Sequence, residues 1–230
     1  MKKSKRYQES LEKYDRENYY SGREGLEIVK SFKETKFDQT IDLVVRLSVD
    51  PRKTEEMIRS TVSLPSGTGK SVRVAVFAQG EAANAATEAG ADHVGAEDLA
   101  SEVEGGMLDF EVAISTPEMM ATVGKLGKML GPRGLMPNPK SGTVTDDVAK
   151  AVEDFKGGKV EFRTDRHGNV HLPIGKVSFS LDQLMENLSV VIEELERLKP
   201  ASSKGRYMKT VSISSTMGPG VKIDPVRING

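Results

Sequence analysis

The chain has 230 residues, with 33 Lys and Arg against 34 Asp and Glu, three His, no Cys and no Trp. Its 37 % hydrophobic content excludes wholesale disorder, and the lack of Cys excludes a disulfide scaffold, a thiolate zinc site and a cysteine nucleophile. The three His are dispersed, so we expect neither a metal nor a cofactor. No apolar run approaches the roughly 20 residues that span a bilayer, and no apolar segment follows the basic N-terminus. We therefore expect a cytoplasmic protein without a membrane partner.

The N-terminal part of the chain predicts a mixture of helices and one clear strand. Charged residues with apolar residues at helical spacing predict helices at 5–20 and 24–34. Strict alternation of apolar and polar residues predicts a half-buried strand at 40–49. A further helix is expected at 54–64, and the Pro-Ser-Gly-Thr-Gly cluster at 65–69 then interrupts regular structure.

The periodicity changes in the middle of the chain, where short apolar strands alternate with helices. The expected strands are 72–77, 92–94 and 110–115, and the expected helices are 81–89, 97–104, 116–130 and 145–155. Thr116 is the predicted N-cap of the third of these helices, with Pro117 in its first turn. This alternation is typical of βαβ units and a parallel sheet.

The last third returns to longer strands and an amphipathic helix. Strands are expected at 159–164 and 170–179, and the polar turn between them predicts a hairpin. Ser180 and Gln183 have the spacing of a capping box, which predicts the start of a long helix. A final strand is expected at 207–214.

This layout predicts an α/β protein of two domains, in which an α+β sheet domain is built from both chain ends. That domain comprises 1–67 and 159–230, and the inserted domain comprises 68–158. An insertion needs its entry and exit close together, and flexible residues at both crossings would form a two-strand hinge. The expected hinge residues are Gly67, Gly69, Gly157 and Gly158. The alternative is one continuous α/β domain with ordinary glycine loops.

The near-neutral net charge hides an uneven distribution. The two outer segments together carry 25 basic and 20 acidic residues, whereas 68–158 carries 8 basic and 14 acidic. Residues 119–145 nevertheless contain no acid, and their basic residues are Lys125, Lys128, Arg133 and Lys140. Local basic surface on a neutral chain indicates a polyanion partner that is met at defined places. The alternative is solubility charge that happens to cluster.

The sequence lacks the patterns of a nucleotide-binding enzyme. Residues 67–71 resemble the end of a P-loop, but Leu64 stands where the first glycine belongs, and a strand follows instead of a helix. Residues 78–83 lack the Gly-x-Gly-x-x-Gly turn of a dinucleotide site. His167 and His171 flank a turn and match no metalloprotease motif. We therefore expect no enzyme, and a protein-interaction module without RNA binding is the remaining alternative.

Three segments suit contact with RNA. Residues 125–142 form a Gly- and Pro-rich segment with spaced cations and exposed amides, and 131–142 is expected to be irregular. In 36–40, Phe37 is placed to stack on a base or sugar, with Lys36 reaching a phosphate. In 214–220, hydroxyls can bind riboses and Gly218 permits close backbone approach. The alternatives are a surface loop, a core-edge Phe and a strand-ending turn.

At these segments the chain resembles a known family. The motifs are KFDQT at 36–40, GKLGKMLGPRGLMPNPKSGTV at 124–144, KVEFR at 159–163 and SSTMGPGVKID at 214–224. They are similar to the bacterial large-subunit ribosomal stalk protein family, protein number one of the large subunit. The resemblance covers nearly the whole chain. It implies a basic domain from both chain ends with an inserted Rossmann-like, three-layer α/β domain.

The resemblance also implies function. It implies binding to large-subunit rRNA to form the mobile stalk beside the exit tRNA site, help in releasing deacylated tRNA, and repression of the chain's own mRNA. We expect a monomer outside the ribosome. The implied contacts of the main domain are Lys36, Phe37, Thr40, Arg163, Arg166, His171, Ser214, Thr216, Met217 and Gly218. Those of the inserted domain are Lys125, Lys128, Arg133 and Lys140. Met107, where members commonly have Trp, and the acid-containing 79–82 depart from the family pattern.

Overall fold

A computed structural model describes residues 4–33, 35–53, 56–201, 203 and 205–228. The chain divides into two compact units. Unit 1 comprises Met1–Gly69 and Phe162–Gly230, and unit 2 comprises Lys70–Glu161. The mixture of helices and strands confirms the expected α/β class. The assignment of two domains with boundaries at 67/68 and 158/159 stays a prediction.

Unit 1 is built on an antiparallel sheet with the strand order β7-β1-β8-β9. Its strands are β1 (Thr40–Leu47), β7 (Asn169–Lys176), β8 (Met208–Ser215) and β9 (Val221–Ile223). β1 follows the predicted alternation, because Ile41, Leu43, Val45 and Leu47 are all buried. β9 was not predicted, since three residues after a Gly-Pro-Gly turn give no periodic signal.

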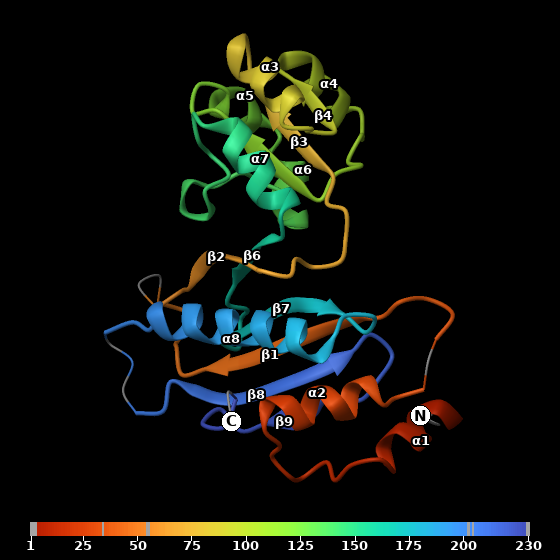
Figure 1. Ribbon diagram of the computed structural model, residues 1–230. Coiled ribbons are helices and arrows are strands. Elements are labelled where there is room, and N and C mark those ends of the chain that lie inside the picture. The colour runs from red at the N-terminus through yellow and green to blue at the C-terminus, as the bar shows by residue number, and fades with distance from the viewer. Residues whose placement is uncertain (1–3, 34, 54–55, 202, 204, 229–230) are drawn as a thin grey trace. The chain divides into compact units, whose positions relative to one another are not determined.

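Helices cover one face of this sheet. α2 (Gly22–Lys30) and α8 (Leu181–Arg197) lie on the same face in Figure 1, whereas α1 (Lys5–Leu11) lies near the N-terminus. The predicted capping box of α8 is present, because Gln183 N–H donates to Ser180 Oγ at 3.2 Å and Ser180 N–H donates to Gln183 Oε1 at 2.9 Å. The opposite face of the sheet keeps the polar residues of the alternating pattern.

The predicted helix at 5–20 is too long, because α1 ends at Leu11. Beyond it, Asp15 Oδ1 accepts the N–H of Glu17 at 2.9 Å, and such a local side-chain bond competes with helix formation. The expected helix at 24–34 begins earlier and ends earlier, as α2, and Ser21 caps it through a capping box with Glu24.

The predicted helix at 54–64 is wrong over its described part, where β2 (Arg59–Ser63) is a strand; residues 54 and 55 lie outside the described residues. β2 pairs with β6 (Lys159–Arg163), which ends in unit 1. Ser and Thr have modest helix propensity, so a strand partner distant in sequence decides the conformation.

The predicted hairpin of the strands at 159–164 and 170–179 is also wrong. β6 pairs with β2 and β7 pairs with β1, and Thr164 and Val170 form an isolated bridge across the turn. The chain turns at Asp165, whose N–H donates to Asn169 O at 2.8 Å. The strands diverge after this turn because each finds a better partner in another part of unit 1.

Unit 2 contains the parallel sheet that the alternating pattern predicted. Its strand order is β4-β3-β5, with β3 (Val74–Phe77), β4 (His93–Gly95) and β5 (Val112–Ser115). One apolar cluster joins the sheet to α3 (Glu81–Glu88) and α7 (Val148–Lys156). A second cluster joins it to α4 (Glu97–Glu104), α5 (Met120–Lys125) and α6 (Gly127–Arg133). The helices therefore pack on the sheet through two separate apolar cores.

The expected helix at 116–130 is divided. Its α-helical part begins at Met120, so Thr116 is not its N-cap. The helix is interrupted at Leu126, which lies between α5 and α6. The segment 131–142 is not irregular from its start, because α6 continues to Arg133. Pro132 is tolerated in the last turn, where its missing N–H forfeits one hydrogen bond. A short 3₁₀ helix, η1 (Pro139–Ser141), follows.

Candidate nucleic-acid interface

The two segments expected to contact RNA in the main domain lie side by side. β1 and β8 are antiparallel neighbours, so residues 36–40, which lead into β1, meet residues 214–218 at the end of β8. Thr216 N–H donates to Thr40 O at 3.0 Å, and Thr40 N–H donates to Thr216 Oγ1 at 3.1 Å. We call residues 36–40 and 214–218 the β1–β8 corner.

The Thr216 hydroxyl is already engaged within the corner. It accepts from Thr40 N–H and donates to Thr40 O at 3.2 Å. The expected ribose contact would therefore use the remaining acceptor capacity of this oxygen. Lys176 of β7, which sequence reasoning missed, donates to Thr40 Oγ1 at 3.0 Å and adds a cation beside the corner.

Met217 is exposed, and the buried Gln39 holds its backbone through a hydrogen bond. Its side chain is 49 % exposed, and its N–H donates to Oε1 of Gln39, which is only 6 % exposed. Gly218 N–H donates to Ser215 O at 3.0 Å. A Cβ on Gly218 would meet Ser215 Oγ and would lie 2.9 Å from the Phe32 ring, so the expected close backbone approach at Gly218 is toward the protein's own core.

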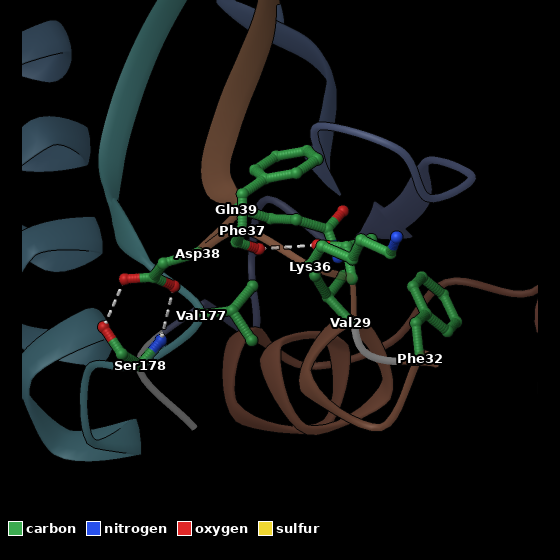
Figure 2. A pocket seen from close by; sticks show the side chains of 9 residues that line it. Val29, Phe32, Lys36, Phe37, Asp38, Gln39, Val177 and Ser178 are labelled. Carbon is green, nitrogen blue, oxygen red and sulfur yellow. Dashed lines mark hydrogen bonds between the residues drawn. The ribbon is translucent and has the colours of Figure 1, made fainter.

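Phe37 and Lys36 are both exposed at this corner, and Phe37 is 53 % exposed. Beside them lies a cavity of about 410 Å³ with Val29, Phe32 and Val177 among its apolar walls. Figure 2 shows the Phe37 ring directed away from Val29 and Phe32. No described acid lies within ion-pair distance of Lys36, so its charge is available to an anionic partner.

One side of this cavity is held by a polar pair that sequence reasoning missed. Ser178 Oγ donates to Asp38 Oδ2 at 2.6 Å, and Ser178 N–H donates to Asp38 Oδ1 at 3.2 Å (Figure 2). Val177 N–H donates to Gln39 O at 2.9 Å. These bonds fix the backbone on which Phe37 stands, although no sequence motif pairs 38–39 with 177–178.

His171 and Ser214 lie on the sheet face that the helices leave uncovered. In the register, Asp42 of β1 faces Ser214 of β8, and Val44 faces His171 of β7. Residues of this parity are half-buried or exposed, in contrast to the buried Ile41 and its equivalents. Thr40 shares their parity, so the open face continues into the β1–β8 corner.

Arg163, Arg166 and His171 surround the turn centred on Asp165. All three are exposed, and His171 Nε2 lies 3.3 Å from Asp165 Oδ2. Burial raises the pKa of Asp165, but hydrogen bonds from Asn169, His167 and His171 outweigh it and hold this pKa well below its usual range. The carboxylate therefore stays charged and organises the turn.

In unit 2 the four expected contacts are exposed cations on a structured segment. None of Lys125, Lys128, Arg133 and Lys140 forms an ion pair with a described acid. Asn138 orders the end of the segment: Lys140 N–H donates to its Oδ1 at 2.8 Å, and its own N–H donates to the buried Thr143 at 2.8 Å. Asn138 and Thr143 were not singled out from sequence.

Two of the expected hinge glycines, Gly67 and Gly69, are held in place by contacts within unit 1. Asn187, fully buried in α8, donates to Gly67 O at 3.0 Å and accepts Ser66 N–H at 3.1 Å. Gly69 has φ +70°, and a Cβ there would lie 2.7 Å from Lys176 Cγ. Both glycines are thus part of unit 1. Gly157 ends α7, and Gly158 has φ +109° directly after it.

The described residues offer contacts to a partner rather than a reaction centre. Among them, no group of three or more His, Asp and Glu side chains is arranged to hold a metal ion. Within the same residues, no helix has the length and apolar character needed to cross a bilayer. The class of protein that this fold and surface define is an α/β binding protein.

Comparison with known proteins identifies the family. Residues 29–219 match the model of the ribosomal protein L1p/L10e family. The chain is 58 % identical over 226 residues to large ribosomal subunit protein uL1 of Cutibacterium acnes, covering 98 % of this chain and 97 % of that protein. It is 56 % identical over 227 residues to uL1 of Nocardioides sp., covering 99 % and 95 %. For uL1 of Thermobifida fusca, the identity is 54 % over 225 residues, covering 98 % and 96 %.

The chain belongs to the ribosomal protein L1p/L10e family. This confirms the resemblance stated from its motifs. Membership identifies a structural protein of the large ribosomal subunit, located on the cytoplasmic ribosome, and confirms the expectation that the chain is not an enzyme.

Proposed function

We propose that the chain binds large-subunit rRNA through the β1–β8 corner, the neighbouring turn at Asp165 and the basic segment of unit 2, and so forms the mobile stalk beside the exit tRNA site. The observation that carries this proposal is the corner itself. Two half-exposed side chains, Phe37 and Met217, stand on a backbone that hydrogen bonds hold in place, one of them to the buried Gln39. Preorganised contacts of this kind bind with a small ordering cost.

The physical roles divide by residue type. Lys36, Arg163 and Arg166 would contact phosphates, which supplies affinity and register but little sequence information. Phe37 would stack on an unpaired base or on a sugar, and the backbone around Gly218 would read the shape of the RNA. Lys125, Lys128, Arg133 and Lys140 would add a second set of phosphate contacts from unit 2.

The two units would act as two domains on one RNA junction. Since Gly67 and Gly69 are packed into unit 1, the flexible joint on the entering strand would lie beyond Gly69, and Gly157 and Gly158 would serve the returning strand. Most of the stalk movement would occur in the RNA, with the joint permitting domain opening. Matching interdomain distances with and without RNA would count against this opening.

Two further activities rest on the same surface. The moving stalk would help deacylated tRNA to leave the exit site. The corner would also bind a similar fold on the chain's own mRNA and repress its translation. A monomer outside the ribosome suffices for both, because the contacts named lie on one chain. Competition between the mRNA leader and the rRNA fragment tests the second activity, and simultaneous binding of both RNAs would contradict it.

Filter binding to a large-subunit rRNA fragment across salt concentrations tests the central proposal. Log affinity should fall with log salt by roughly 0.7–0.9 per phosphate contact. Phe37→Ala and Thr216→Ala should each cost on the order of 1–3 kcal/mol of binding free energy. Tyr19→Ala is the matched control, because Tyr19 is also 53 % exposed but lies outside the corner.

The outcomes separate the proposal from its alternatives. Unchanged binding in both corner variants would remove the site assignment while leaving rRNA binding intact. A protein-interaction module would show no salt-dependent RNA binding at all. Replacing Lys125, Lys128, Arg133 and Lys140 with Gln should reduce the salt slope, whereas Lys150→Gln on α7 should leave it unchanged.

A further inference from the structure

Unit 1 contains a second cavity at the far end of β8 from the β1–β8 corner. It encloses about 370 Å³ between the C-terminal end of α8, the start of β8 and the residues after β9. Met208 lines this cavity and begins β8, whereas Ser215 ends the strand at the corner. At about 3.4 Å per residue, the two places are separated by roughly 24 Å. One nucleotide therefore cannot occupy both.

Two cations that line this cavity form no close ion pair with a described acid. Lys199 Nζ lies 6.0 Å from the centre of the Tyr207 ring, and no described acid lies within ion-pair distance of it. Arg206 is 3.7 Å from Asp224 Oδ1, which is a long contact for an ion pair. Both side chains are exposed. They can therefore turn toward a phosphate group at the cavity mouth.

A buried aromatic side chain accompanies the cations. Tyr207 forms part of the cavity wall, and its hydroxyl is buried without a hydrogen-bond partner among the described residues. The oxygen has no accessible surface, so a ligand in the cavity would meet the rest of the Tyr207 side chain, whose ring lies beside Lys199.

The remaining wall residues suit the other parts of a nucleotide. Glu196 is an exposed carboxylate, which accepts hydrogen bonds from ribose hydroxyls. Met208 and Val226 supply apolar surface, and Val226 is 82 % exposed, so it is open to the face of a base. A cavity of this size lies within the usual range for small-molecule sites.

We propose that this cavity binds one nucleotide unit, with Lys199 and Arg206 on the phosphate and Glu196 on the ribose. The same chemistry is available from a free nucleoside monophosphate or from one nucleotide of an RNA strand. The site is separate from the proposed rRNA interface and does not depend on it.

The test is a titration of the full-length protein, followed by amide chemical shifts, with uridine 5′-monophosphate, uridine and inorganic phosphate as separate probes. Uridine monophosphate should shift amides around 199 and 206–208 and should bind more tightly than either part. Arg206→Gln and Lys199→Gln should each weaken it about tenfold, as expected for loss of a charge-assisted hydrogen bond. Lys209→Gln, on the same strand outside the cavity, should bind as the original chain does.

A second arm identifies the source of the nucleotide. If an RNA strand supplies it, Arg206→Gln should lose footprint protection on an rRNA segment that Phe37→Ala leaves protected. If a free nucleotide supplies it, the footprint should be the same in Arg206→Gln and the original chain while uridine monophosphate binding is lost. The proposal is overturned if uridine monophosphate produces no localised shifts, or if Lys209→Gln weakens it as much as Arg206→Gln does.

Discussion

The backbone N–H of Met217 donates a 3.0 Å hydrogen bond to Oε1 of Gln39, so a buried side chain before β1 holds an exposed residue after β8. The two residues are 178 positions apart in the sequence. Gln39 also accepts Val177 N–H through its backbone carbonyl. It thereby joins three separate segments at the proposed interface.

Gln39→Met should loosen the corner while preserving side-chain volume. Removing the acceptor costs about 0.5–1.5 kcal/mol of unfolding free energy, because water can solvate the half-exposed Met217 backbone. We expect faster amide exchange at Met217 and weaker rRNA binding. Gln39→Glu retains an acceptor and should keep the slow exchange. Equal exchange rates at Met217 in all three proteins would refute this role of Gln39.

Gly218→Ala should disturb the corner by overpacking. The new methyl group would meet Ser215 Oγ and the Phe32 ring, which costs about 1–3 kcal/mol of unfolding free energy. Gly220→Ala is the control, since a Cβ there meets nothing within 4 Å. Urea unfolding and rRNA binding should both separate the two variants. Equal unfolding free energies of the two variants would contradict the predicted overpacking at Gly218.

Asp165→Asn should weaken the turn that carries Arg166. The pKa of Asp165 is lower in the folded protein than its ordinary value of 3.8. The ionised carboxylate therefore stabilises the fold above that ordinary value, and this contribution is lost as the pH falls below it. The variant should lose about 1–2 kcal/mol at neutral pH and show a weaker acid dependence of unfolding. Asp146→Asn, at an exposed position outside the helices, should do neither.

Tyr207→Phe should change the alkaline stability. Burial raises the pKa of Tyr207 to about 12. The contribution of its neutral hydroxyl is fully present below the unfolded value near 10 and is lost as the pH rises toward 12. The variant should not show this part of the decrease in unfolding free energy at alkaline pH. Urea unfolding of the two proteins across pH measures the difference. At neutral pH it should be as stable as the original chain or more stable, because a partnerless buried hydroxyl is removed.

Asn187→Ala should release the segment at Gly67. The side chain bonds to Ser66 N–H, Gly67 O and Ile174 O, and its loss leaves these groups unpaired beside a small cavity. We expect a loss of about 2–4 kcal/mol and faster amide exchange at residues 66–69. Asn84→Ala, exposed on α3, should be neutral or slightly stabilising. Unchanged exchange at 66–69 would contradict the anchoring role.

Local patterns predicted the elements whose signal is carried by neighbouring residues. The alternation in β1, the capping box of α8 and the βαβ succession of unit 2 each arise from residues a few positions apart. The helix expected at 54–64 and the hairpin around Asp165 failed for the opposite reason. Both β2 and β6 are strands because they pair with each other, and a window of ten residues contains no information about a partner about a hundred residues away.

The amino-acid sequence alone determined the family, the α/β class and the residues Phe37, Thr216 and Gly218 as candidates, because motifs and short-range periodicity are written in neighbouring residues. Only the tertiary structure decided that 36–40 and 214–218 form one corner, that Gln39 supports Met217, and that Tyr207 stands in a separate cavity. Those relationships depend on strand pairing between distant segments, where the free energy comes from burial and hydrogen bonds that exist only after the chain has folded.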